Sequence, residues 1–119
     1  MASFRELEVY QRAQELFPKV YALVRNWNQL DQRELGSQMI RAANSIHANI
    51  AEGHAKSTLD FKRYISISLG SCDEICGHLK DAANIGLVSL ERSRELANEY
   101  EIVGKQLTRL KQSLPLTRN

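Results

Sequence analysis

In two long stretches of the sequence, the spacing between successive, mostly apolar residues alternates strictly between four and three positions. This spacing limits the fold more than any other feature. The first stretch contains Phe61, Ile65, Ser68, Cys72, Ile75, Leu79 and Ala82, and the second contains Leu96, Tyr100, Val103, Leu107, Leu110 and Leu114. On an α-helix this spacing forms one stripe of the kind buried in coiled-coil-like packing. We therefore predict helices over residues 58–84 and 89–114.

The N-terminal half predicts two further amphipathic helices. Apolar residues recur every three or four positions at Val9, Ala13, Leu16, Val20, Val24 and Trp27, and again at Leu35, Met39, Ala42, Ala43, Ile46 and Ile50. These patterns predict helices over residues 4–27 and 33–52. No segment alternates as a strand does, and the loops are short. The chain is thus expected to form one all-α domain, residues 1–119, as an antiparallel up-down-up-down four-helix bundle.

Capping residues mark the predicted helix boundaries. Gly53 is expected to end the second helix, and Ser57 or Thr58 to begin the third. Gly86 permits the chain to reverse after the third helix, and Ser89 can cap the fourth. The boundaries therefore agree with the apolar spacing.

Composition and residue spacing argue against several functional classes. No apolar run approaches the roughly 20 residues of a membrane span, and the N-terminus lacks the apolar stretch of a signal peptide, so a cytoplasmic protein without membrane contact is expected. Cys72 and Cys76 are too few for a zinc site and are interpreted as core thiols. His47, His54 and His78 are scattered over two predicted helices and a loop. We therefore expect no catalysis, metal, cofactor or small-molecule substrate.

The second predicted helix carries a polar stripe beside its apolar side. Arg41, Ser45, Asn49 and Glu52 follow one another at steps of four and three residues. One interpretation is a solvated edge. The alternative is a partly buried network between helices, in which carboxylates and small polar groups satisfy the guanidinium of Arg41. In that alternative, replacing Arg41 by alanine destabilises the fold more than an ordinary surface change does.

The third predicted helix has two glycines on a stripe away from its apolar seam. Gly70 and Gly77 stand one heptad apart, with Glu74 between them. Each interior glycine costs about 1 kcal/mol relative to alanine, so the pair suggests close approach of another backbone. Tolerated surface glycine is the simpler explanation. Our hypothesis is that this face packs on a helix of the same chain or of a neighbouring subunit, with Glu74 available to Arg41 or Arg63.

Four segments of the sequence resemble a known family. These segments are "FRELEVYQRAQEL", "SQMIRAANSIHANIAEG", "DFKRYISISLGSCDEI" and "VGKQLTRLKQSL". Together they resemble the bacterial four-helix bundle proteins whose founding members are encoded in intervening sequences of large-subunit ribosomal RNA genes. The most specific element is "RAA.SI..NIAEG", and the resemblance covers nearly the whole chain. The ribosomal label given to such proteins reflects the position of their genes.

The resemblance implies a set of motif residues and a tendency to assemble. It assigns Arg41, Ser45, Asn49, Ala51, Glu52 and Gly53 to the motif of the second helix and Gly70, Ser71 and Glu74 to that of the third. His54 and Ser68 depart from the usual family pattern. Members resemble small bundles that form rings, often fivefold, so the resemblance implies a homo-oligomer, with a pentamer as one form. A distant relative is a basic bundle that binds nucleic acid and a reverse transcriptase.

Basic residues in two regions of the chain provide the sequence evidence for nucleic-acid binding. The candidate phosphate contacts are Lys56, Lys62, Arg63, Lys105, Arg109 and Lys111. Contacts of this kind give affinity that falls with salt and carries no sequence preference. The net charge is only +2, so a solvated basic surface is the competing interpretation. A protein–protein interaction module that does not bind RNA or DNA is the alternative function.

Overall fold

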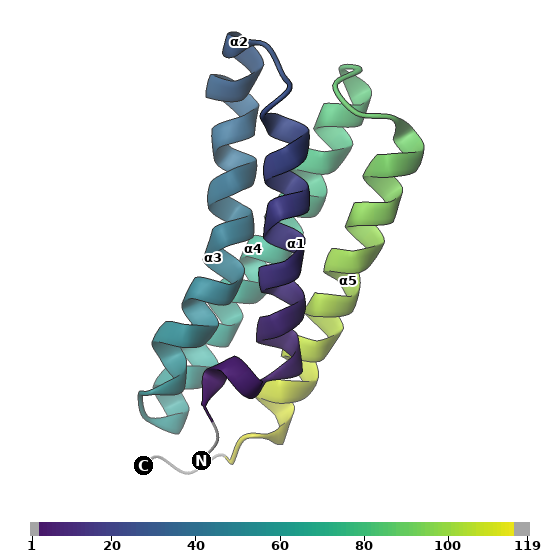
Figure 1. Ribbon diagram of the computed structural model, residues 1–119. Coiled ribbons are helices and arrows are strands. Elements are labelled where there is room, and N and C mark those ends of the chain that lie inside the picture. The colour runs from purple at the N-terminus through teal and green to yellow at the C-terminus, as the bar shows by residue number, and fades with distance from the viewer. Residues whose placement is uncertain (1–2, 116–119) are drawn as a thin grey trace.

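The computed structural model describes residues 3–115, and four long helices dominate that part of the chain (Figure 1). They are α1 (Glu8–Val24), α3 (Ser37–His54), α4 (Thr58–Asn84) and α5 (Leu90–Ser113). Consecutive long helices are antiparallel and in contact, which confirms the predicted four-helix bundle. The bundle measures 48 × 23 × 20 Å. Across residues 3–115, no helix is both long enough and apolar enough to span a membrane.

The N-terminal half contains short helical elements that the apolar spacing does not reveal. The 3₁₀ helix η1 (Phe4–Glu6) is separated from α1 by Leu7, whose ψ of 126° is extended. The next helical backbone starts at Gln29, not at position 33, because α2 (Gln29–Asp31) and the π-helical η2 (Gln32–Gly36) continue directly into α3. The Gln32 side chain donates to the carbonyls of Val24 (3.2 Å) and Arg25 (3.0 Å), which caps the end of α1.

Side-chain caps begin three of the helices. The side-chain oxygens of Asn28, Ser57 and Ser89 each accept a hydrogen bond from the backbone N–H three residues later, at 2.9, 3.2 and 3.0 Å. These bonds satisfy amides that have no partner inside the helix. Gly86 has φ +80°, as the reversal between α4 and α5 requires.

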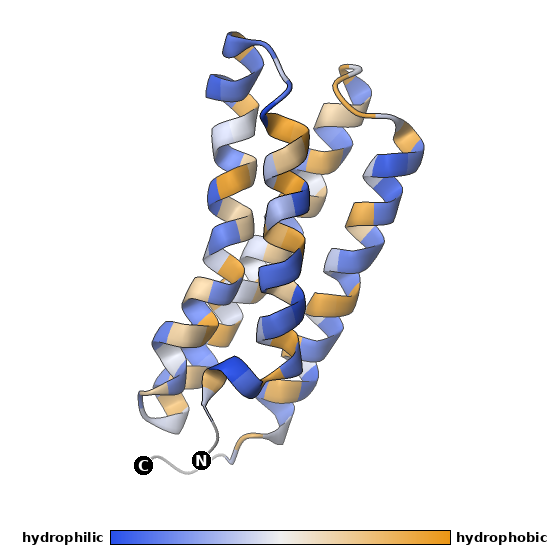
Figure 2. Ribbon diagram, in the orientation of Figure 1, coloured by the Kyte–Doolittle hydropathy of each residue, from blue (hydrophilic) through white to orange (hydrophobic). Residues whose placement is uncertain are grey.

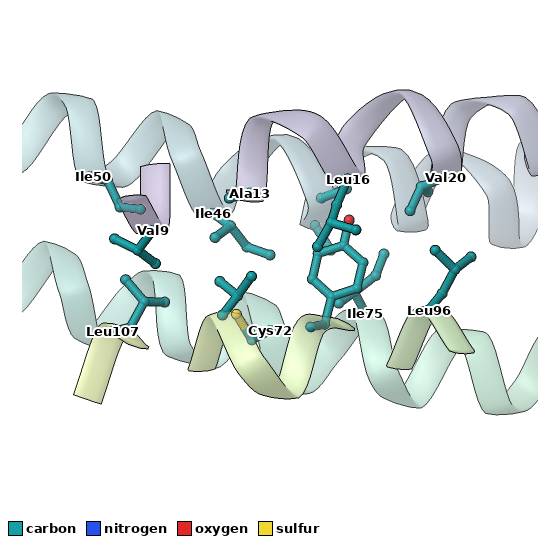
Figure 3. Close-up of a cluster of buried hydrophobic side chains, with 14 of the residues drawn as sticks. Val9, Ala13, Leu16, Val20, Ile46, Ile50, Cys72, Ile75, Leu96 and Leu107 are labelled. Atoms are coloured by element: carbon teal, nitrogen blue, oxygen red, sulfur yellow. The ribbon is translucent and has the colours of Figure 1, made fainter. Parts of the chain in front are cut away.

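Figure 2 shows hydrophobic residues at intervals along the long helices. Their side chains meet in one core along the bundle axis (Figure 3). Fully buried side chains come from all four long helices, among them Leu16, Ile46, Ile75 and Leu107. Every member of the predicted α4 seam, from Phe61 to Ala82, is buried. Because burial of one Leu or Ile side chain stabilises a fold by about 1.5–3 kcal/mol, this core is the main source of stability.

Candidate nucleic-acid interface

Serine hydroxyls connect α3 with α4 beside the core. Ser71 Oγ donates to Ser45 Oγ at 2.9 Å, and the Asn49 amide donates to the same hydroxyl at 2.8 Å. The fully buried Ser68 donates to the Ile46 carbonyl at 2.9 Å. Ser68 is one of the two departures from the family pattern, and its bond satisfies a hydroxyl that would otherwise be buried without a partner.

Arg41 and Glu74 line one surface pocket with Ser45 and Ser71, but in the described chain no charged member of the predicted network forms a hydrogen bond with these serines. Arg41, Glu52 and Glu74 are exposed. Glu52 pairs with Lys56 at 3.7 Å, and Glu74 pairs with His78 at 3.2 Å. In the region spanning 3–115, Arg41 makes no ion pair. The expected buried pairing of Arg41 is therefore absent, because burying a guanidinium costs more than leaving it in water.

We expect replacement of Arg41 by alanine to change the free energy of unfolding by less than about 0.5 kcal/mol, as for other exposed positions. Replacement of Ser68 by alanine should cost about 1 kcal/mol, because it removes a buried interhelical hydrogen bond. Urea denaturation of both variants measures the two values. If Arg41→Ala lowered the free energy of unfolding as much as Ser68→Ala or more, the conclusion that serine hydroxyls and not Arg41 connect α3 with α4 would be contradicted.

The glycine that permits close packing of α3 on α4 is Gly53, not Gly70 or Gly77. A Cβ atom at position 53 would lie 2.6 Å from Tyr64 Cβ and 3.1 Å from Phe61 Cδ1. At positions 70 and 77 a Cβ would meet no atom within 4 Å. The hypothesis that the face of Gly70 and Gly77 packs on a helix of the same chain is therefore wrong. Gly53 also lies inside α3, which ends one residue later.

The bundle brings the two groups of predicted basic residues to one end of the molecule. The start of α4 and the end of α5 are neighbours, because Lys111 Nζ donates to Ser66 Oγ at 2.7 Å. Lys62 lies one helical turn before Ser66, and Ser66 donates in turn to the Lys62 carbonyl at 3.1 Å. Residues 45 positions apart in sequence are thus joined directly.

Only some of these cations are neutralised by acids. Lys56 pairs with Glu52, and Arg63 pairs with Asp60 at 3.2 Å. The remaining four cations have no acidic partner within the described part of the chain. We call these four the cation track: Lys62, Lys105, Arg109 and Lys111. Their positive charge is therefore available to an anionic ligand on the outer surface of α4 and α5.

A groove of about 640 Å³ runs between α4 and α5 next to the cation track. Leu69, Cys72, Cys76, Tyr100 and Gly104 line its apolar floor. Its polar lining consists of two carboxylates, two cations and a hydroxyl, from Asp73, Glu101, Lys105, Arg109 and Thr108. We call it the α4–α5 groove. The apolar spacing does not reveal it, because that spacing identifies the inner faces of helices and not which outer residues become neighbours.

The chemistry of the groove suits binding and not nucleophilic attack. Burial raises the pKa of Cys76 to about 11, with nearby Glu101 and Asp73 adding to the rise. Burial also raises the pKa of Cys72 to about 12. Both thiols are therefore protonated near neutral pH, and a thiol is a weak nucleophile. The described residues contain no cluster of three or more His, Cys, Asp or Glu side chains arranged to hold a metal ion.

Two of the three histidines belong to a row of aromatic rings that η1, α1, α3 and α4 contribute. His47 lies edge-to-face with Tyr10 and Phe17, each 5.9 Å away between ring centroids, and His54 lies 5.5 Å from Phe61. His78 is outside this row, on α4. No carboxylate or nucleophile completes a catalytic arrangement around His47 among residues 3–115. Packing is therefore the role that its position indicates.

Because burial lowers the pKa of His47 below 6.5, the protein should lose stability in acid. As pH falls through about 6.5, the unfolded chain gains a proton at this imidazole more readily than the folded chain does, which favours unfolding. We expect the free energy of unfolding to fall less between about pH 8 and about pH 5 for His47→Gln than for the wild type. Chemical denaturation across pH measures this, and parallel curves for the two proteins would contradict it.

Comparisons with known proteins agree with this fold. The family model described as 23S rRNA-intervening sequence protein matches residues 5–109. A crystal structure of a protein with unknown function from the S23 ribosomal protein family of Bacteroides thetaiotaomicron is similar, with a TM-score of 0.81 and 22% identity. The similarity covers 88% of this chain and 96% of the other and, at this identity, indicates a shared fold alone. No curated protein sequence matches the chain.

Proposed function

We propose, since this chain belongs to the 23S rRNA-intervening sequence protein family, that it is a non-enzymatic bundle that binds the phosphate backbone of nucleic acid. The observation that carries the proposal is the cation track. Lys62, Lys105, Arg109 and Lys111 come from two separate regions of the sequence and form no ion pair in the described chain. Lys111 meets Ser66, one helical turn after Lys62, and Lys105 and Arg109 line the groove between the same two helices. Nucleic-acid phosphates are the common polyanions that such a surface suits.

Binding of this kind should depend on salt and not on sequence. Cations that contact phosphates release counterions, so the logarithm of the binding constant falls linearly with the logarithm of the salt concentration. Because the net charge of the whole chain is only +2, the attraction must come from the cation track itself.

Fluorescence anisotropy of labelled RNA and DNA strands, titrated with the protein over a salt series, tests the proposal. Affinity that falls steeply with salt supports it. Absence of binding at about 50 mM salt, or binding that ignores salt, would refute it.

Self-association is a second proposed property, favoured by a different surface. Gly70 and Gly77 on α4 have open space around them, and the neighbouring Ile67 is 45% exposed. A helix of another copy could approach this face closely, because no side chain stands at the two glycine positions. Repetition of the cation track around an assembly would also make its binding multivalent.

Light scattering measures the mass of the assembly directly. We expect more than one copy per particle for the wild type and a lower mass for Gly70→Leu, because leucine would block the approach. A monomeric wild type, or an unchanged mass in the variant, would count against this surface.

A further inference from the structure

The α4–α5 groove has an asymmetry that the cation track alone does not explain. Lys105 and Arg109 line it toward the end where Lys111 meets Ser66. Asp73 and Glu101 line it beside Cys76, which contacts the Ala97 carbonyl at 3.7 Å farther along the bundle. The lining of the groove is therefore cationic at one end, apolar along its floor and acidic at the other end.

The geometry points to an unpaired nucleotide of a single-stranded nucleic acid as the occupant of the α4–α5 groove. This inference rests on the proposed function and specifies its substrate class. A nucleotide has the same order of chemical groups, since its phosphate is anionic, its base has apolar faces, and the edge of the base carries hydrogen-bonding groups. The distance along α5 from Glu101 to Arg109 is about 12 Å, a length that a nucleotide can span.

Charge determines the orientation of the nucleotide. The carboxylates of Asp73 and Glu101 repel phosphate, so the backbone should lie over Lys105 and Arg109 with the base directed toward the acids. In a stacked strand the faces of each base are covered by neighbouring bases, and in the groove the apolar floor takes their place. A base within a duplex is paired and stacked and cannot enter the groove, so single strands should be preferred.

The acidic end should also select among bases. Aspartate and glutamate accept hydrogen bonds from exocyclic amino groups, such as N4 of cytosine. Uracil presents a carbonyl oxygen at the same position, which a carboxylate repels. Neither Asp73 nor Glu101 forms an ion pair inside the described region. Their oxygens are therefore not held in an ion pair, although Lys105 lines the same groove one helical turn from Glu101. Cytosine should accordingly bind more tightly than uracil.

Anisotropy with an all-cytosine strand, an all-uracil strand and an RNA duplex tests this inference. The wild type should prefer the cytosine strand to the uracil strand by about fivefold or more, and both strands to the duplex. Gly104→Leu should reduce binding of the cytosine strand to the duplex level. Because a Cβ at position 104 meets no atom within 4 Å, the variant should fold. Ala22→Leu adds the same kind of side chain on exposed α1 and should have no effect.

A second pair of variants isolates the acidic end. Asp73→Asn and Glu101→Gln should raise the affinity for both strands, because they remove negative charge near the phosphates. The ratio of cytosine to uracil affinity should nevertheless fall toward one. A purely electrostatic role of these carboxylates would leave that ratio unchanged.

The outcomes separate the two proposals. Binding could depend on salt yet be equal for the duplex and the single strands, and unchanged in Gly104→Leu. That result overturns the inference and leaves the proposed function standing. A lower assembly mass in Gly104→Leu would identify the groove as a contact between copies and would also overturn it. Absence of all nucleic-acid binding refutes the proposed function itself.

Discussion

Replacing Lys105 and Arg109 together by glutamine should weaken binding of a single strand about 25-fold at ~0.1 M salt. Each phosphate contact on a single strand contributes a salt exponent of about 0.7, which corresponds to roughly fivefold in affinity at that concentration. Both residues belong to the cation track and have no acidic partner in the described chain. Anisotropy titrations of the wild type and the double variant measure the difference.

The matched control removes the same charge from the same end of the bundle. Lys56 and Arg63 are paired with Glu52 and Asp60, so replacing both by glutamine should weaken binding much less. Equal losses in the two double variants would show that only total charge matters, and the cation track would then have no separate role.

The second large effect concerns stability. Replacing Gly53 by alanine should lower the free energy of unfolding by about 1–3 kcal/mol, the usual cost of overpacking. The new Cβ would lie 2.6 Å from Tyr64 Cβ. An atom so close to the backbone of α4 cannot move away as the tip of a flexible side chain can, so the two helices must separate. Thermal and urea denaturation measure the loss.

The same substitution at Gly70 is the control, because it changes the same atoms on an open helix surface. No atom lies within 4 Å of a Cβ at that position. We expect Gly70→Ala to gain about 0.5–1 kcal/mol from better helix propensity. If Gly53→Ala were as stable as Gly70→Ala, the close approach of α3 and α4 at Gly53 would be disproved.

The fold was predictable because the core depends on spacing alone. Alternation of four and three positions identifies the buried face of α4 completely, and Ser68 is buried on it as the pattern requires. The family resemblance drawn from "RAA.SI..NIAEG" is also confirmed by the match over residues 5–109. The extended residue Leu7 and the π-helical turn before α3 were not predictable. Local backbone geometry, not apolar periodicity, determines both.

The site was predictable only in part, since it depends on which outer faces become neighbours. The sequence identified the six cations, but it could not show that Lys56 and Arg63 are paired while Lys111 meets Ser66 across α4 and α5. It left open both a solvated edge and a partly buried network for Arg41, whereas the structure exposes Arg41 and makes the interhelical bonds with serine hydroxyls. Such contacts depend on small differences in how each helix is rotated about its axis. These rotations cannot be read from the spacing of residues in the sequence.

Lysine footprinting tests the central claim most directly, because three of the chain's six lysines belong to the cation track and three do not. Chemical acetylation is measured by mass spectrometry with and without a single-stranded oligonucleotide. We predict protection of Lys62, Lys105 and Lys111, with Lys19, Lys56 and Lys80 modified as fast as in the free protein. Equal protection at all six positions, or protection confined to the second group, would contradict a phosphate site on α4 and α5.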